Sequence, residues 1–140
     1  MAEAKYIQTL SVNASTKHLA EVRDFVAAHA ESIGLSPKDI SEIRLAVDEA
    51  YTNIIKHAYK NAPTKKVSIE IGSDSSILWI SLMDEGKSFD PSSYSEPDLK
   101  RRIKEKKRGG MGVYLIKKLM DQVQYNRKGR TNEIRMVKNL

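Results

Sequence analysis

Three polar side chains recur at intervals of four residues within 36–59, a segment whose apolar residues have helical spacing. They are Glu49, Asn53 and His57. Residues four apart lie on one face of a helix, so an acid, an amide and an imidazole would be stacked in successive turns. Such a row could present a base, a metal ligand and an orienting group to one spot. An ordinary amphipathic helix with a polar outer face has the same spacing, so the spacing alone leaves both interpretations open.

Two glycine-containing motifs also have residue types suited to a ligand. Asp84 and Gly86 follow the apolar segment 77–83, where the carboxylate could accept hydrogen bonds and the glycine could let a ligand approach the backbone. Gly-Gly-Met-Gly at 109–112 precedes a segment of helical spacing, and glycine amides at a helix N-terminus can bind phosphate. A surface turn is the alternative for the first motif, and a flexible hinge with a helix cap is the alternative for the second.

The elements that must position these residues follow from apolar periodicity and from turn and cap residues. Ser36 and Pro37 are typical of a helix start, and Gly34 is typical of the end of the preceding helix. Residues 84–109 have little apolar periodicity, which predicts a long loop. In chain order, we expect a strand at 6–12, a helix from Ser15 or Thr16 to Ile33, a helix at 36–59, strands at 66–71 and 77–83, the loop, a helix at 112–120, and strands at 123–127 and 133–137.

This order of elements predicts an α+β fold, because strands and helices are segregated rather than strictly alternating. We expect a two-layer α/β sandwich, with helices on one face of a mixed, mostly antiparallel sheet. The chain has 140 residues, enough for one domain with its own core, and no internal repeat or boundary divides it. We therefore expect a single domain over 1–140.

The composition excludes several classes of protein. The chain has no cysteine, which rules out disulfides, thiolate zinc sites, iron–sulfur clusters and cysteine nucleophiles. It has no apolar run of the ~18 residues that a membrane-spanning helix needs, and residues 1–10 lack the apolar core and cleavage site typical of a signal sequence. We expect a cytoplasmic protein with no membrane partner. The net charge of +6 is unevenly distributed, and the basic block 98–108 is typical of a solvated segment that can meet an anionic partner.

Several familiar nucleotide-binding patterns are absent. The residues after Gly112 lack the third Rossmann glycine, and the chain has no G-x-x-x-x-G-K-[ST] phosphate loop. The H-R-D and D-F-G motifs of eukaryotic-type protein kinases are missing as well. A nucleotide site in this chain would therefore need another architecture.

The combination of motifs is much more specific than any one of them. E-x-x-x-N-x-x-x-H on a helix, D-x-G after a strand, a basic lid and G-x-G opening a helix resemble, in this order, the N, G1 and G2 boxes of the GHKL (Bergerat-fold) ATPases and kinases. The stretches EIRLAVDEAYTNIIKHAY, DEGKSFDP and GGMGVYLIKKLMDQV carry the likeness, which covers essentially the whole chain. Within that superfamily the chain resembles the stand-alone anti-sigma-factor serine kinases of the RsbW/SpoIIAB type. The resemblance implies an ATP lid at about 87–109.

The resemblance implies a role for each motif residue. Asn53 would ligate Mg²⁺, a hard ion suited to an amide oxygen and to nucleotide phosphates. Glu49 would be the general base for the incoming serine hydroxyl, and Asp84 would accept a hydrogen bond from the adenine amino group. The other implied nucleotide contacts are His57, which shapes the pocket, Gly86, which keeps it open, Arg108, which neutralises charge on the γ-phosphate, and Gly110, Met111 and Gly112, which lie against the phosphates.

The implied activity is that of an ATP-dependent protein-serine kinase. It would phosphorylate a small STAS-type anti-anti-sigma protein and, in its alternative state, sequester a sigma factor, and the resemblance suggests a homodimer. One alternative is a nucleotide-gated binding module that does not phosphorylate, although such a module needs no base at Glu49. The other is a basic nucleic-acid-binding domain that uses 98–108, which has no interleaved aromatic residues and no recognised nucleic-acid motif.

The chain departs from the family pattern in its last strand and in its lid. The family often has Gly-Thr-Thr before the last strand, with a threonine near the adenine. Here the segment 130–133 reads Arg-Thr-Asn-Glu, so Thr131 is not assigned to the site. The lid is also richer in lysine and arginine than the resemblance implies.

Overall fold

The computed structural model describes residues 6–58, 65–86 and 112–140, and the expected lid at 87–109 lies outside them. Every strand and helix expected from the sequence is present, with its bounds shifted by a few residues. In chain order the elements are β1 (Tyr6–Asn13), the 3₁₀ turn η1 (Thr16–His18), α1 (Leu19–Ser32), α2 (Pro37–Asn53), the π-helical turn η2 (Ile54–Ala58), β2 (Lys66–Ser73), β3 (Ile77–Asp84), α4 (Gly112–Leu119), β4 (Gln122–Lys128) and β5 (Thr131–Asn139).

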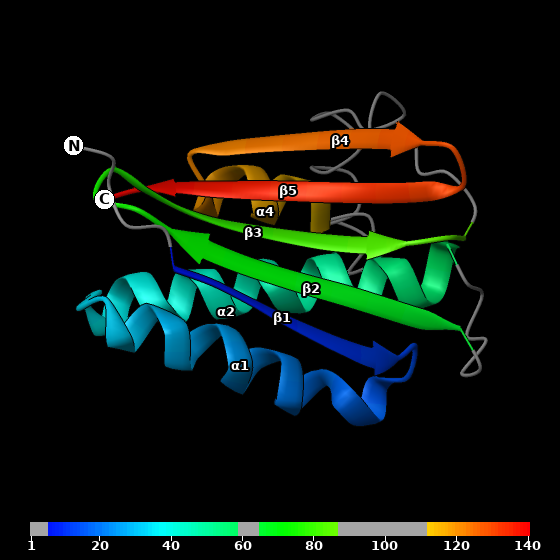
Figure 1. The fold of residues 1–140 in the computed structure, drawn as a ribbon, viewed down its shortest axis with the longest axis horizontal. Helices are drawn as coiled ribbons and strands as arrows, with labels where there is room; N and C mark the ends of the chain where they lie inside the picture. Colours follow the sequence, from blue (N-terminus) through cyan, green and yellow to red (C-terminus); the bar gives the residue numbers. More distant parts are fainter. Residues whose placement is uncertain (1–5, 59–64, 87–111) are drawn as a thin grey trace, which may run out of the picture.

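The five strands form one sheet in the order β1-β2-β3-β5-β4, and every neighbouring pair is antiparallel (Figure 1). The expectation of a mixed sheet was therefore wrong. Along the chain, α1 and α2 follow β1 and run in opposite directions. The chain therefore returns to the end of the sheet at which β1 stopped, and β2 begins there. The described helix α4 leads into β4, which runs in the same direction as β3, but β5 lies between these two strands.

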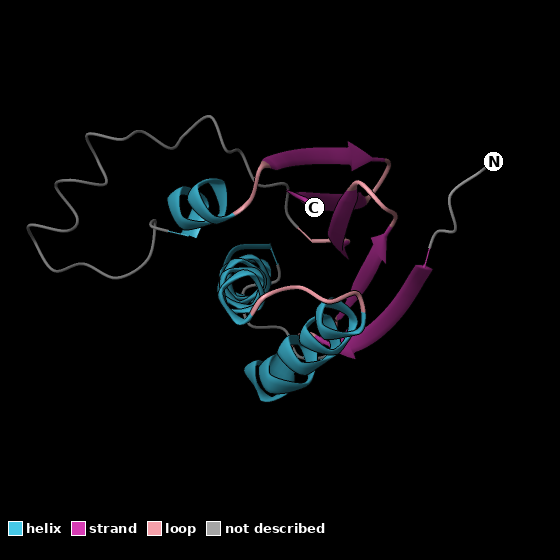
Figure 2. Cartoon of the chain, turned by 90° about the vertical axis from the view of Figure 1, so that its left-hand side faces the viewer, coloured by secondary structure: helices cyan, strands magenta, loops and turns pink. Residues whose placement is uncertain are grey.

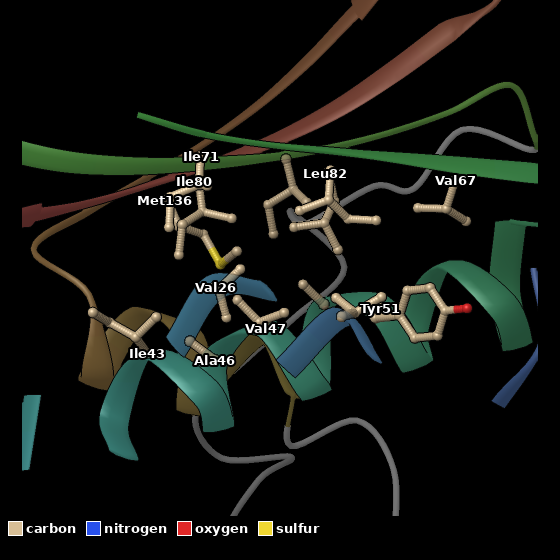
Figure 3. Close-up of a cluster of buried hydrophobic side chains, with 14 of the residues drawn as sticks. Val26, Ile43, Ala46, Val47, Tyr51, Val67, Ile71, Ile80, Leu82 and Met136 are labelled. Carbon is tan, nitrogen blue, oxygen red and sulfur yellow. The ribbon is translucent and has the colours of Figure 1, made fainter. Parts of the chain in front are cut away.

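The described helices cover one face of the sheet, which confirms the predicted two-layer α+β sandwich (Figure 2). Alternate residues of the inner strands point at the helices and are fully buried, as expected for a half-covered sheet. The apolar stripe predicted for α2 faces them, with Ile40 at its partly buried edge (Figure 3). Its buried members are Ile43, Val47, Ala50, Tyr51 and Ile54.

The start and rotation of α2 are fixed by polar contacts. The hydroxyl of Ser36 accepts a hydrogen bond from the backbone N–H of Asp39 at 3.1 Å, and Pro37 occupies the first turn, as the sequence predicts. The buried Tyr51 hydroxyl lies 2.7 Å from the carbonyl oxygen of Ser15, in the connection between β1 and α1. These contacts hold the polar face of α2 at a fixed angle to the sheet.

A lysine on β5 connects α2 and α4. The Lys138 ammonium donates to Glu42 Oε2 at 2.9 Å and to the carbonyl oxygen of Leu119 at 3.2 Å. The first contact anchors α2, and the second anchors the last residue of α4. The hydrogen bond and the charge of Lys138 lower the pKa of Glu42, so the carboxylate of Glu42 stays ionised under mildly acidic conditions.

A buried histidine connects α1 to the strands β1 and β2. His29 Nδ1 lies 3.0 Å from Gln8 Oε1 on β1, and Nε2 lies 2.9 Å from the hydroxyl of Ser73 on β2. A neutral ring can donate to the first group and accept from the second. Burial lowers the pKa of His29, because the charged imidazolium loses its hydration.

Replacing His29 with glutamine is expected to reduce the loss of stability at acidic pH. The unfolded histidine binds a proton near pH ~6.5, whereas the folded one does so only at lower pH. The contribution of His29 to the free energy of unfolding is therefore fully present above pH ~6.5. Below that pH it falls by up to about 1.4 kcal/mol per pH unit. Urea unfolding of both proteins between pH 7.5 and 5 measures the effect. An equally steep decline in the variant would contradict it.

Candidate functional site

The polar face of α2 supplies two of the predicted site residues. Glu49 and Asn53 are one turn apart, and both are half-buried. No hydrogen bond or ion pair joins either side chain to another residue within 6–58, 65–86 or 112–140. Figure 1 shows that the end of α2 and the carboxyl end of β3 lie at the same end of the molecule. A half-buried carboxylate and a half-buried amide are thus left available near the end of the sheet.

The neighbouring acid on α2 has a structural partner instead. Asp48 Oδ1 lies 3.1 Å from Arg23 Nε on α1, and burial raises the pKa of this carboxyl group. The ion pair is part of the contact between α1 and α2. Of the two adjacent acids, Glu49 is therefore the one without a partner among the described residues.

The last part of the predicted helix differs from the expectation. We expected an α-helix to residue 59, but α2 ends at Asn53 and continues as the π-helical turn η2. The wider turn allows the consecutive residues Ile54 and Ile55 both to be buried. The four-residue spacing that put His57 in line with Glu49 and Asn53 therefore does not hold across this turn. The side chain of His57 lies outside the described part.

Asp84 is the last residue of β3 and is 6% exposed. Its Oδ1 accepts hydrogen bonds from the backbone N–H of Gly86 at 2.8 Å and from Asn132 Nδ2 at 2.9 Å. Both hydrogen bonds that the carboxylate accepts from described residues thus go to one oxygen. The other oxygen, Oδ2, accepts no hydrogen bond from the described residues.

Two residues at this position were missed by the sequence analysis. The sheet register pairs Asp84 with Asn132, and Asn132 with Arg127 on the edge strand β4. Asn132 Nδ2 also donates to the carbonyl oxygen of Gly86 at 3.0 Å, and Arg127 Nη1 donates to Asn132 Oδ1 at 2.6 Å. The unusual segment 130–133 was the available signal, but the contact requires the register between β3 and β5.

Thr131 occupies a different position from its neighbour. Side chains alternate between the faces of a sheet, and Asn132 shares the helix-facing side with the buried residues Ile134 and Met136. Thr131 therefore points to the opposite face, away from Asp84. This agrees with leaving Thr131 out of the predicted site.

The phosphate side of the predicted site is described only in part. Arg108, Gly110 and Met111 lie outside the described residues. Gly112 is the first residue of α4, which packs against α2. Figure 1 shows that α4 starts at its end nearer the carboxyl end of β3 and runs away from it. The N-terminus of α4 is thus directed toward the end of the sheet that holds Asp84.

The donor set fits a metal ion that is held jointly with a nucleotide. No group of three or more histidine or acidic side chains in the described ranges could hold a metal by itself. Asn53 offers one hard amide oxygen with no described partner, and a nucleotide would supply the remaining oxygens.

No described helix is long and apolar enough to cross a membrane.

The sequence is similar to characterised bacterial proteins. A family model described as histidine kinase-like ATPase domain matches residues 12–138. The serine-protein kinase RsbW of Halalkalibacterium halodurans is 34% identical over 119 residues, which cover 82% of this chain and 72% of the relative. RsbW of Bacillus subtilis is 33% identical over 126 residues, which cover 86% of this chain and 78% of the relative.

Two solved structures have the same fold at low sequence identity. The RsbU and RsbW domains of a Mycobacterium tuberculosis protein align with a TM-score of 0.68 and 13% identity, covering 95% of this chain but only 31% of that one. The SiaB-SiaC complex from Pseudomonas aeruginosa gives a TM-score of 0.67 and 13% identity, covering 93% of this chain and 88% of the matched chain. At this identity the likeness supports the fold alone.

Proposed function

Because this chain belongs to the histidine kinase-like ATPase domain family, and within it to the RsbW serine-protein kinases, we propose that it phosphorylates a STAS-type anti-anti-sigma protein on serine. In the alternative state it would sequester a sigma factor. The chain is an ATP-binding protein-serine kinase by family. One observation carries the proposal: Glu49 and Asn53, which have no partner among the described residues, lie on α2, and α2 ends at the same end of the molecule as β3, whose last residue is Asp84.

The proposed mechanism assigns one task to each of these side chains. Asp84 Oδ2 accepts a hydrogen bond from the adenine amino group, and this fixes the base. Glu49 accepts the proton of the substrate serine while the serine oxygen bonds to the γ-phosphorus and the bond to the β–γ bridging oxygen breaks. Asn53 would hold Mg²⁺, which offsets charge on the phosphates when it is bound.

The remaining predicted residues keep their proposed roles. Arg108 would offset charge on the γ-phosphate, and His57 and Gly86 would shape the pocket around the base. Gly110, Met111 and Gly112, which lead into α4 along the chain, would offer backbone amides to the phosphates. We also propose a homodimer, which rests on the family resemblance alone. We propose a cytoplasmic location, because a kinase that exchanges a sigma factor for its substrate must meet both proteins there.

The direct test is phosphate transfer from labelled ATP. The protein is incubated with γ-labelled ATP, Mg²⁺ and STAS proteins from the same genome, with and without their acceptor serines. Label on a STAS protein, lost when its serine is replaced by alanine, is the expected result. Tight ATP binding without any transfer would instead favour the non-catalytic binding module.

Replacing Asn53 with alanine is expected to weaken ATP binding about fivefold when Mg²⁺ is present. The variant loses one hydrogen-bonding or ligating group, which contributes about 1 kcal/mol. Without Mg²⁺, in excess chelator, the two proteins should bind ATP equally. Calorimetric titration in both buffers measures the difference, and an equal loss in both would show that Asn53 acts on the fold rather than on the metal.

A further inference from the structure

We propose that Asn132 is a positioning residue for base recognition, which fixes one oxygen of Asp84 so that the other faces the nucleotide base. The inference rests on the proposed function, because it assumes that Asp84 accepts the adenine amino group. It concerns a residue that the family resemblance does not assign. Its evidence is a row of three side chains across the strands β3, β5 and β4.

Asn132 connects the two ends of a short turn. Its Nδ2 donates to Asp84 Oδ1 at 2.9 Å and to the carbonyl oxygen of Gly86 at 3.0 Å. Both acceptors lack a proton of their own, so each needs a donor, and an amide nitrogen has two hydrogens. Asn132 therefore holds the carboxylate and the backbone after it in one arrangement.

Arg127 determines which way the Asn132 amide points. Its Nη1 lies 2.6 Å from Asn132 Oδ1 and 3.5 Å from the carbonyl oxygen of Gly86. A guanidinium can only donate, so the amide oxygen must face Arg127 and the amide nitrogen must face Asp84. The orientation of Asn132 is thus fixed by chemistry rather than by packing alone.

This arrangement gives Asp84 a defined specificity. Its Oδ1 is occupied by the N–H of Gly86 and by Asn132, so Oδ2 is the oxygen that remains for a base. A carboxylate oxygen accepts from the 6-amino group of adenine and repels a 6-oxo group at the same place. A site built around such a hydrogen bond discriminates strongly against the analogue that lacks the donor. Asn132 would therefore control selectivity between 6-amino and 6-oxo purines through Asp84.

The test compares ATP with inosine triphosphate, which carries an oxygen in place of the 6-amino group. Dissociation constants for both, with Mg²⁺, are measured for the parent protein and for Asn132→Ala. We expect the parent to bind ATP at least tenfold more tightly than inosine triphosphate. In the variant, this ratio of dissociation constants should be at least threefold smaller. Asn126→Ala is the matched control, because Asn126 donates at 3.1 Å to Glu133 on the exposed part of the same hairpin.

Each outcome decides the inference. An unchanged preference in Asn132→Ala, or an equal loss of affinity for both nucleotides, would overturn the positioning role but leave the proposed function intact. A parent protein that does not bind ATP would overturn both. If Asn132→Ala does not fold, the exposed Arg127 is replaced instead, since Arg127→Ala frees the amide to rotate. A preference for ATP unchanged in Arg127→Ala would then overturn the inference.

Discussion

Replacing Glu49 with glutamine is expected to slow phosphate transfer by at least about a hundredfold while ATP binding stays at the parent level. General base catalysis typically contributes factors of 10²–10⁴, and glutamine keeps the shape of the side chain but cannot take the proton. The structure favours Glu49 over its neighbour, because Asp48 is paired with Arg23 whereas Glu49 has no described partner. Initial rates with labelled ATP and calorimetric binding of ATP measure the two quantities.

The matched control is Glu31→Gln, which makes the same change at an exposed position near the end of α1. This variant should transfer phosphate at the parent rate. A parent rate in Glu49→Gln would mean that another group accepts the serine proton and that the mechanism proposed here is wrong. Loss of ATP binding in that variant would assign Glu49 to the nucleotide instead.

Local signals were sufficient to predict most of the fold. The cap residues Ser36 and Pro37 fix the start of α2, and its apolar spacing gives the buried stripe that includes Val47. Such signals depend on residues a few positions apart, so they can be seen in a single sequence. Which strands become neighbours depends on distant parts of the chain. Because β5 lies between β3 and β4, the two strands that run in the same direction are not paired, and the expectation of a mixed sheet was wrong.

The end of α2 shows a second limit of local reasoning. Helical spacing predicted one continuous polar row, but burial of both Ile54 and Ile55 accompanies a change to π-helical geometry directly after Asn53. Tertiary packing thus overrides the period that was used to align His57 with Glu49. The part of the row that lies within regular α-helix, Glu49 and Asn53, has the predicted spacing.

The site around Asp84 depends on contacts between distant residues. Asp84 itself could be proposed from its motif, whereas its contact with Asn132 joins positions 48 residues apart. Arg127 enters only through the pairing of β4 with β5. A motif identifies the residue that touches the ligand, but the residues that orient it are determined by the register of the sheet.

Replacing Asp84 with asparagine is expected to lower the affinity for ATP about tenfold or more. In the parent protein, two donors point at Oδ1, the N–H of Gly86 and the amide of Asn132. The amide oxygen of the new asparagine would have to accept from both, which turns its NH₂ group toward the position of Oδ2. A donor would then face the adenine amino group, in place of a hydrogen bond to a charged group worth about 1.5–3 kcal/mol.

Isothermal titration with ATP and Mg²⁺ measures this loss, and circular dichroism shows whether the variant is folded. Asp24→Asn, at an exposed position on α1, is the control for the change of charge and should bind as the parent does. The variant should also lose its preference for ATP over inosine triphosphate, because an amide can donate to the 6-oxo group. Unchanged affinity in a folded Asp84→Asn protein would remove Asp84 from the nucleotide site, and the role of Asn132 would then be limited to holding the turn between β3 and the residues that follow it.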